Sequence, residues 1–281
     1  MNATNETNDG QSTLWNGDAG HAWVEAQGPL DRMYKPFEDL LVDAVHTTNL
    51  TRVLDVGCGT GGTTLAIAKR LGTKGQCLGI DISTAMIDAA RARAERDHAP
   101  VRFICADAQT YGFDPASVDM IVSRFGVMFF DDPIRAFANL RRAATDDAEL
   151  RVIAWRSPTE NAFMTTAERA AAPILPNLPV RQPDAPGQFG FANASRVHTI
   201  LEQSGWGEIE LRPIDVACTL PKNELRRYLT RFGPVGKALE STDEGTRATV
   251  IESILPAFDS FIHGADVRFT ASCWTVGARA R

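Results

Sequence analysis

The sequence predicts an α/β fold with a doubly wound, mostly parallel sheet. Between residues 52 and 155, short apolar runs alternate with segments whose apolar residues recur with helical period. Such alternation favours parallel strands joined by right-handed crossover helices. The run V-L-D-V-G-C-G-T-G-G at 53–62 changes abruptly from apolar residues to glycines, as expected for a buried strand followed by a tight turn and a helix.

The individual elements of this core follow from local patterns. Its predicted strands are Arg52–Val56, Gln76–Asp81, Val101–Ala106, Val118–Ser123 and Leu150–Trp155. Helices are predicted over Thr63–Leu71, after Ser83, and over Pro133–Ala144. Ser83 is a residue type favoured at helix N-caps, and the apolar residues after it fall on one helical face.

The chain before the core reads as a tail and a helical arm. Residues 1–12 are polar and predict a disordered tail. The stretch W-N-G-D-A-G-H-A-W then places Trp15 and Trp23 among polar residues and glycines, where they either cap a ligand or anchor the arm to the core. Apolar spacing over 30–45 predicts a helix, with Pro36 in its first turn.

Two regions follow from this organisation. Residues 1–50 form the tail and helical cap, and residues 51–281 form the core. Within the core, 157–194 holds six prolines and predicts a lid insertion, because ring-locked residues cannot sit inside regular structure. The segment at about 222–263 predicts a helical insertion. The other predicted elements are a helix over Ser195–Ser204 and strands over Glu208–Val216 and Val267–Val276.

Composition narrows the class of function. The 281 residues carry a net charge of −6 and include no run of five like charges, which disfavours a nucleic-acid or anionic-membrane surface. The five cysteines are odd in number and lack a C-x-x-C pair, so neither a disulfide framework nor a metal site is supported. No apolar window reaches the roughly 18 residues of a membrane span. We therefore expect a cytoplasmic protein whose partner is a small molecule.

The glycine loop indicates a ligand site, and the acid before it indicates the charge of the ligand. Gly57, Gly59 and Gly62 match G-x-G-x-x-G, in which a ligand lies against backbone N–H groups at a helix N-terminus. Asp55 precedes the loop by two residues, and its carboxylate would repel the pyrophosphate of a dinucleotide by roughly 1–4 kcal/mol. The acid favours a cationic ligand, such as one with sulfonium and ammonium groups.

Further polar or large residues follow successive strands. Asp55, Asp81, Asp107, Ser123 and Trp155 each lie at or just beyond the carboxyl end of a predicted strand. Open α/β sheets bind ligands along this edge. Asp81 also lies about 20 residues beyond the glycines, where an acid can accept hydrogen bonds from ribose hydroxyls. These side chains are therefore expected to converge on one site.

The pattern D-V-G-C-G-T-G resembles the first motif of class I S-adenosylmethionine-dependent methyltransferases. The resemblance is firm over residues 51–124, and it implies a seven-stranded Rossmann-like sheet closed by a hairpin, with S-adenosyl-L-methionine as cofactor. The segments W-N-G, S-R-F-G-V-M-F-F and P-G-Q-F-G-F-A are similar to the small-molecule, ubiquinone-biosynthesis-like branch. No N-P-P-Y or D-P-P-Y follows the fourth strand, which disfavours the branch that methylates nucleic-acid amino groups.

The resemblance also implies roles for individual residues. G-I-D-I-S is similar to the second motif, in which Asp81 would hold the ribose while Ile82 and Met86 lie against adenine, although Met86 is equally suited to the core. A-D-A is similar to the third motif, in which Asp107 and the N–H of Ala108 would bind the adenine edge. The full predicted cofactor set is Trp15, Trp23, Asp55, Gly57, Cys58, Gly59, Asp81, Ile82, Met86, Asp107, Ala108 and Ser123.

The loop S-R-F-G-V-M-F-F places a charged residue among aromatics directly after a strand. In the resembling proteins this loop borders the transferred methyl group, so Ser123 would contact the methionine end of the cofactor. Arg124 and Phe125 would face the acceptor, and Arg124 would bind its carboxylate or phenolate. The alternative is a salt bridge from Arg124 to a nearby acid such as Asp131 or Asp132.

The catalytic assignment rests on two residues. Arg124 is a candidate for stabilising an ionised acceptor. His21 is a candidate base, because it is the histidine with aromatic and glycine neighbours rather than a place inside a helix or strand; a solvated surface histidine is the alternative. Two other functions fit the glycine loop: an NAD(P)-dependent oxidoreductase, and a non-catalytic module that binds S-adenosylmethionine.

Overall fold

The computed structural model describes residues 9–45 and 52–281. Its strands are β1 (Arg52–Val56), β2 (Gln76–Asp81), β3 (Val101–Cys105), β4 (Val118–Arg124), β5 (Ala144–Trp155), β6 (Trp206–Pro221), β7 (Ile262–His263) and β8 (Asp266–Ala280). Its α-helices are α1 (Asp9–Asn16), α2 (Asp18–Glu25), α3 (Gln27–Asp43), α4 (Gly62–Leu71), α5 (Thr84–Arg96), α6 (Pro133–Ala143), α7 (Ala162–Ala171), α8 (Ala194–Gln203), α9 (Lys222–Arg231), α10 (Gly233–Leu239) and α11 (Glu244–Ile254).

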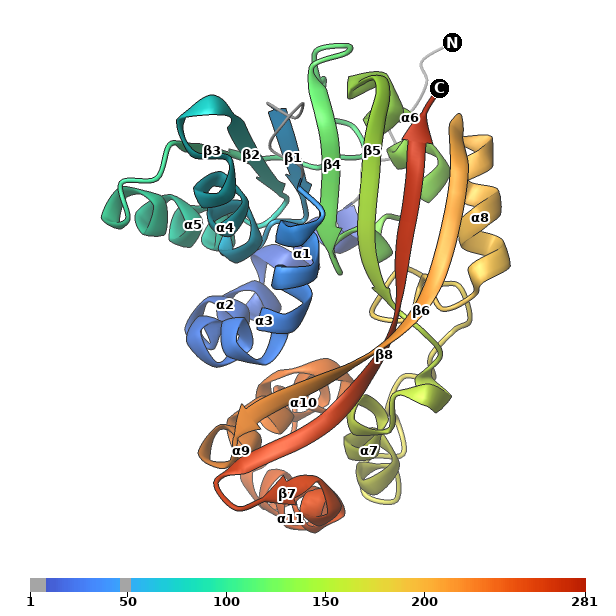
Figure 1. The fold of residues 1–281 in the computed structure, drawn as a ribbon. Coiled ribbons are helices and arrows are strands. Elements are labelled where there is room, and N and C mark those ends of the chain that lie inside the picture. The colour runs from blue at the N-terminus through green and yellow to red at the C-terminus, as the bar shows by residue number, and fades with distance from the viewer. Residues whose placement is uncertain (1–8, 46–51) are drawn as a thin grey trace.

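The strands form one sheet in the order β3-β2-β1-β4-β5-β8-β6, and the short β7 pairs with β8 (Figure 1). Strands β1 to β5 are parallel, whereas β8 is antiparallel to both β5 and β6. This arrangement confirms the predicted doubly wound, mostly parallel sheet. The strand order reverses between β1 and β4, which is where such sheets bind ligands at their carboxyl edge.

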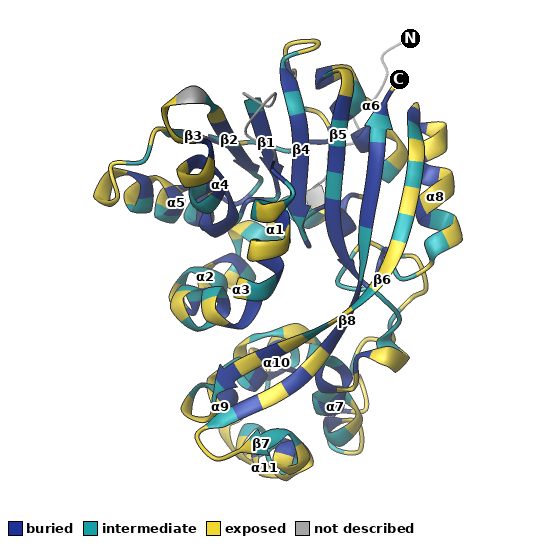
Figure 2. Ribbon diagram, in the orientation of Figure 1, coloured by how far each residue is buried: buried dark blue, intermediate teal, exposed yellow. Residues whose placement is uncertain are grey.

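The parallel strands are buried because helices cover both faces of the sheet. Leu54 of β1, Ile80 of β2 and Ile121 of β4 are fully buried. Figure 2 shows these strands largely in dark blue, whereas the edge strand β6 mostly alternates between half-buried and exposed residues. A continuous apolar run therefore suits the central strands, and an alternating pattern suits the edge.

The helical cap differs from its prediction in two places. Helix α1 begins at Asp9, so the predicted tail over 1–12 is wrong for its last residues, while residues 1–8 lie outside the described residues. Pro36 lies inside α3 rather than in its first turn. A proline in a helix removes one backbone hydrogen bond. Burial of Met33 and Phe37 on the face of α3 that meets the sheet offsets this cost.

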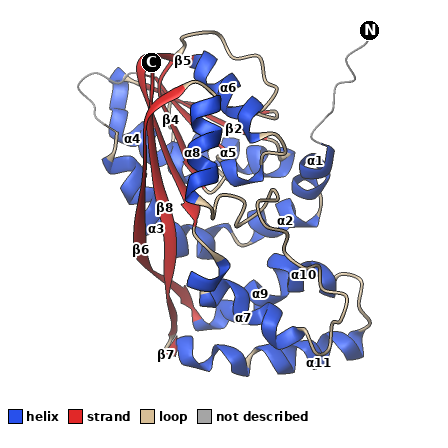
Figure 3. Cartoon of the chain, turned by 90° about the vertical axis from the view of Figure 1, so that its right-hand side faces the viewer, coloured by secondary structure: helices blue, strands red, loops and turns tan. Residues whose placement is uncertain are grey.

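Strands β6 and β8 are longer than predicted and extend beyond the sheet as a two-stranded ribbon (Figure 3). Their outer ends carry α7, α9, α10 and α11, which together we call the helical lobe (Figure 1). Aromatic contacts hold this lobe together. The rings of Phe163 from α7 and Phe269 from β8 stack with centroids 3.9 Å apart, and Phe258 packs edge-on against Phe163.

Helix α7 lies within the segment 157–194, which the proline count predicts as irregular throughout. The prolines all lie before or after it, at 158 and from 173 onward. Helix α10 lies within the predicted helical insertion at about 222–263, and Gly233 and Pro234 open it. None of the helices in the described ranges is long and apolar enough to cross a membrane.

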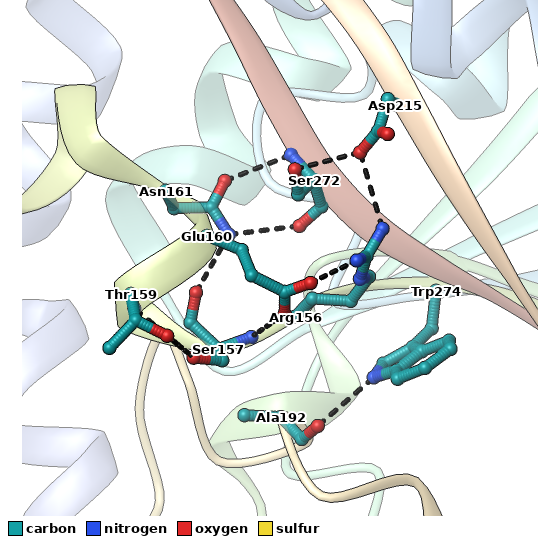
Figure 4. A network of polar contacts seen from close by, with 9 residues as sticks. All are labelled: Arg156, Ser157, Thr159, Glu160, Asn161, Ala192, Asp215, Ser272 and Trp274. Carbon is teal, nitrogen blue, oxygen red and sulfur yellow. Dashed lines mark hydrogen bonds and ion pairs between the residues drawn. The ribbon is translucent and has the colours of Figure 1, made fainter.

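A polar network fixes the start of the helical lobe to the ribbon (Figure 4). The buried amide of Asn161 accepts from the N–H of Ser272 at 2.9 Å and donates to the carbonyls of Ser272 and Ser157 at 2.9 and 3.1 Å. Arg156 forms ion pairs with Glu160 and with Asp215 of β6. The chain leaving β5 is therefore held against β8 and β6 before α7 begins.

Replacement of Asn161 tests this anchor. We expect Asn161→Ala to lower the free energy of unfolding by roughly 1–3 kcal/mol, because it leaves the buried N–H of Ser272 without its partner and removes one of two hydrogen bonds to the Ser272 carbonyl. Chemical denaturation followed by circular dichroism measures the change. Thr159→Ala is the matched control, since Thr159 belongs to the same network but is exposed. Equal stability of the two variants would contradict the assigned role.

Candidate functional site

A cavity of about 750 Å³ lies where the carboxyl edge of the sheet, the helical cap and the helical lobe meet. Its walls come from two groups of elements. The loops after β1, β2, β3 and β4 and the helices α1 to α3 line one part, and Trp155 together with α7, α9 and α10 lines the other. Volumes of this size are typical of small-molecule sites.

The glycine loop after β1 is tied to β2 and touches the loop after β4. The N–H groups of Gly57 and Cys58 both donate to the carbonyl of Ile80, at 2.9 and 3.1 Å. Gly57 has a φ of +66°, and a Cβ on it would lie 2.6 Å from Cα of Gly126. Only glycine fits at either contact. Gly126 is not among the site residues predicted from the sequence, because a single glycine after a strand is not a distinctive pattern.

Asp55 lies at the end of β1 with its carboxylate buried against the cavity. Its side chain is 1% exposed and accepts a hydrogen bond from the Thr64 hydroxyl at 2.7 Å. Burial raises the pKa of Asp55 to about 6, although the Thr64 hydrogen bond and the charge of Arg124 act in the opposite direction. A buried carboxylate with so little compensation favours a cationic ligand.

Asp81 at the end of β2 organises the same loop. Its carboxylate accepts from the N–H of Gly59 at 2.8 Å and from the N–H of Ser83 at 2.9 Å. Burial raises the pKa of Asp81, and these backbone hydrogen bonds oppose the rise. The two oxygens have about four acceptor sites between them, so the carboxylate can still accept hydrogen bonds from two ribose hydroxyls.

The predicted adenine-binding residues lie on the β2 and β3 side of the cavity. Ile82, Met86, Asp107 and Ala108 all line it. Asp107 also stabilises the loop after β3, because its carboxylate accepts a hydrogen bond from the N–H of Gln109 at 2.9 Å. Met86 is buried on α5, so it serves the core and the cavity wall at once.

The helical cap is anchored to the adenine side by Asn16, which the sequence analysis missed. Its amide donates to the carbonyl of Ile82 at 3.1 Å and accepts from the N–H of Thr84 at 2.9 Å. The ring of Trp15 packs edge-on against Phe129, with centroids 5.0 Å apart, and Trp23 also lines the cavity. The tryptophans therefore anchor the cap to the core and also line the cavity. The two predicted roles, anchoring the arm and covering a ligand site, are compatible.

Arg124 lies at the end of β4 and lines the cavity. Its guanidinium donates to the backbone carbonyl of Tyr34 at 3.4 Å and lies 5.9 Å from the centre of the Tyr34 ring. Among the described residues no carboxylate forms an ion pair with it, so the alternative pairing with Asp131 or Asp132 is not observed. Arg124 is therefore a cation that faces the cavity.

Phe125 follows Arg124 with a φ of +67°, which is uncommon for a bulky residue. Its ring stacks on Trp155, with centroids 4.9 Å apart and an interplanar angle of 15°. Phe125 and Trp155 thus form one aromatic surface at the carboxyl ends of β4 and β5. Strain of this kind at a cavity wall is typical of functional sites.

Two predicted site residues do not line the cavity. The hydroxyl of Ser123 is fully buried, donates to the carbonyl of Val56 at 2.7 Å and accepts from the N–H groups of Gly126 and Val127. Ser123 therefore shapes the loop that carries Arg124. His21 is exposed and lies inside α2, so the expectation that it lies outside regular structure is wrong. Helix α2 turns this side chain toward solvent.

The residues present fit S-adenosylmethionine. A buried acid faces the cavity beside the glycine loop, a second acid retains acceptor sites for a ribose, and soft apolar side chains flank a third acid. The pyrophosphate of a dinucleotide would instead meet Asp55 and Asp81 at close range. The donor set therefore matches a cation that carries an adenosine group.

Comparison with known proteins agrees with this geometry. The model of the methyltransferase domain family matches residues 53–147, the segment from β1 to the start of β5. Over these residues the chain is similar to methyltransferase domains that use S-adenosylmethionine. The matched segment contains Asp55, Asp81, Asp107 and Arg124, whereas the helical cap and the helical lobe lie outside it.

Two curated methyltransferases illustrate the relationship. Aklanonic acid methyltransferase from Streptomyces sp. strain C5 is 32% identical over 133 residues, which cover 46% of this chain and 60% of that protein. Demethylmenaquinone methyltransferase from Staphylococcus haemolyticus is 21% identical over 187 residues, covering 64% of this chain and 78% of that protein. The chain thus spans less than two thirds of the length of the first of these relatives.

Solved structures share the fold. The YcgJ protein from Bacillus subtilis aligns over 88% of this chain and 99% of its own, with a TM-score of 0.58 and 18% identity. An S-adenosylmethionine-dependent methyltransferase from Aquifex aeolicus aligns over 87% of this chain and 89% of its own, with a TM-score of 0.51 and 17% identity. These likenesses identify the Rossmann-like methyltransferase fold.

The raised pKa of Asp55 predicts how cofactor affinity depends on pH. Below about pH 6 the carboxyl of the free protein is protonated, and a bound cation favours the ionised form, so binding must release a proton. We expect the affinity for S-adenosylmethionine to fall about tenfold from pH 7 to pH 5, since pH 5 lies about one unit below this pKa. Calorimetric titration at both pH values measures it.

The matched variant for this prediction is Asp55→Asn. It keeps the size of the side chain and removes the titrating group, so its affinity should be lower at pH 7 and change less with pH. Any slope that remains belongs to other groups, such as Asp81. The same tenfold change in Asp55→Asn would contradict the assignment to Asp55.

Proposed function

We propose that the protein transfers the methyl group of S-adenosylmethionine to a flat, largely apolar small molecule at an oxygen, carbon or nitrogen atom. One observation carries the proposal: the cofactor part of the cavity is continuous with a second part whose walls are aromatic. We call this second part the acceptor chamber. Its wall includes Trp155, Phe163, Met164, Tyr228, Leu229 and Phe232. An aromatic chamber favours ring systems, which stack on or pack edge-on against its walls.

The names of the relatives support a ring acceptor. They include aklanonic acid methyltransferase, demethylmenaquinone methyltransferase and a 2-phytyl-1,4-naphthoquinone methyltransferase from Trichormus variabilis, which is 26% identical over 114 residues. The last name specifies a fused quinone ring. We therefore place phenols, enols and hydroquinones first among candidate acceptors.

The chain's own residues would contribute positioning and charge. When bound, S-adenosylmethionine supplies a methyl group on a sulfonium that is already a good leaving group. Asp55, Asp81 and Asp107 hold the cofactor, while the aromatic walls hold the acceptor ring and exclude water. Positioning of this kind can supply roughly 7–11 kcal/mol of the barrier reduction. Arg124, at the junction of the two parts, stabilises an ionised acceptor oxygen.

Two alternative functions are less well supported. An NAD(P)-dependent oxidoreductase would place a dianionic pyrophosphate beside the buried Asp55, which is unfavourable. A non-catalytic cofactor-binding module would not need an aromatic chamber of this size beside the cofactor. We further propose a cytoplasmic location, supported by five free cysteines, of which four are buried.

A labelling experiment tests the function. The protein is incubated with methyl-labelled S-adenosylmethionine and a panel of phenols, hydroquinones, amines and 2-oxo acids, and products are detected by mass spectrometry. We expect labelled product from at least one ring hydroxyl or hydroquinone. Failure across the whole panel, with S-adenosylhomocysteine still bound tightly, would favour the non-catalytic module.

The two catalytic candidates differ in their predicted effects. Arg124→Ala should lower kcat on the order of a hundredfold, since it removes the cation beside the developing charge, and should change cofactor affinity far less. His21→Ala should change kcat less than tenfold, because the side chain is exposed and does not line the cavity. Steady-state kinetics with the acceptor found above gives both values. Unchanged turnover in Arg124→Ala would end the proposal for that residue.

A further inference from the structure

The acceptor chamber contains two tyrosines whose polar groups the catalytic proposal does not use. Tyr34 comes from α3 of the helical cap, and Tyr228 comes from α9 of the helical lobe. Both line the cavity. The two covers of the chamber therefore each contribute a tyrosine to its wall.

The surroundings of the pair are almost entirely aromatic. The ring of Tyr34 stacks on Trp23, with centroids 6.3 Å apart and an interplanar angle of 15°. The ring of Tyr228 packs against Phe163 at 5.8 Å and against Phe232 at 5.4 Å. A hydroxyl in such a wall is a recognition point for a ligand oxygen.

The hydroxyl of Tyr228 has only a weak partner within the protein. It donates to Sδ of Met164, at 3.4 Å. A thioether is a weak acceptor. An oxygen atom of a ligand in the chamber would be a better partner for this hydroxyl.

The charge state of the pair defines its role. Burial raises the pKa of Tyr228 to about 12 and the pKa of Tyr34 well above its ordinary value, so both phenols stay neutral donors. Two other titratable groups act on them. Arg124 lies beside Tyr34 and is cationic, and the Cys218 thiol of β6 is neutral, because burial raises its pKa to about 12. Neither tyrosine can serve as a base near neutral pH.

We propose that Tyr228 is the specificity-determining residue that donates a hydrogen bond to an oxygen of the acceptor ring. The inference rests on the proposed function, because it assumes that the acceptor occupies the chamber beside the cofactor. Tyr228 then selects ring hydroxyls and carbonyls over hydrocarbons of the same shape. Because an oxyanion accepts a stronger hydrogen bond than a neutral hydroxyl, the same contact favours the ionised acceptor.

A spectroscopic probe tests the assignment without requiring turnover. The probe is 7-hydroxycoumarin, a flat phenol whose neutral and ionised forms absorb at different wavelengths. It is bound to the protein saturated with S-adenosylhomocysteine, and its pKa is read from the two absorption bands. We expect binding to lower the pKa of the probe, and Tyr228→Phe to raise the bound value by about one unit, a tenfold change in the ionisation constant.

The remaining tyrosine offers a matched control. Tyr111 packs against Phe113 and does not line the cavity, so Tyr111→Phe makes the same chemical change and should leave the pKa of the bound probe unaltered. Tyr34→Phe should raise it by less than Tyr228→Phe, because the proposed hydrogen bond to the acceptor comes from Tyr228. S-adenosylhomocysteine affinity, measured on each variant, shows whether the site remains folded.

The outcomes distinguish a failure of the proposed function from a failure of the role assigned to Tyr228. If the wild-type protein does not bind S-adenosylhomocysteine, the proposed function itself fails. If it binds this ligand but does not bind the probe, or if the bound probe has the same pKa in wild type, Tyr228→Phe and Tyr34→Phe, then the role of Tyr228 is overturned and the proposed function stands.

Discussion

The burial of Asp55 is the constraint on which the site depends. Desolvation alone would favour the neutral acid, and the Thr64 hydrogen bond only partly offsets it. The carboxylate becomes fully favourable when a cation lies beside it in the cavity. The neighbouring backbone serves the same end, because the left-handed Gly57 and the carboxylate of Asp81 hold the loop open for a ligand instead of filling the space with side chains.

The acceptor chamber depends instead on the length of two strands that extend beyond the sheet. Strands β6 and β8 continue past the sheet and place α9 opposite the helical cap, so that Tyr228 and Tyr34 line the same cavity. Ion pairs from Glu25 of α2 to Arg227 and Arg231 of α9 join the same covers at the surface. The cofactor part is thus built from adjacent strand ends, and the chamber from segments about 200 residues apart.

Local patterns explain why the cofactor part could be predicted. Strands β1 and β2 begin and end as predicted, since a short apolar run followed by an acid or glycines fixes both ends of a buried strand. The chamber could not be predicted. Whether Tyr34 and Tyr228 line one cavity depends on how far the ribbon of β6 and β8 extends and on the direction in which it turns. Pro36 shows the same limit of local patterns. Proline usually ends or kinks a helix, but the packing of α3 keeps this residue inside the helix.

The central claim is that Asp55 and Asp81 select an adenosine ligand that carries an ammonium group over a dinucleotide that carries a pyrophosphate, and competitive calorimetry tests it most directly. S-adenosylhomocysteine, NAD and NADP are each titrated into the intact protein under identical conditions. The account predicts that S-adenosylhomocysteine binds with one site per chain and that neither dinucleotide gives measurable heat. Micromolar binding of NAD or NADP, with none of S-adenosylhomocysteine, would contradict it.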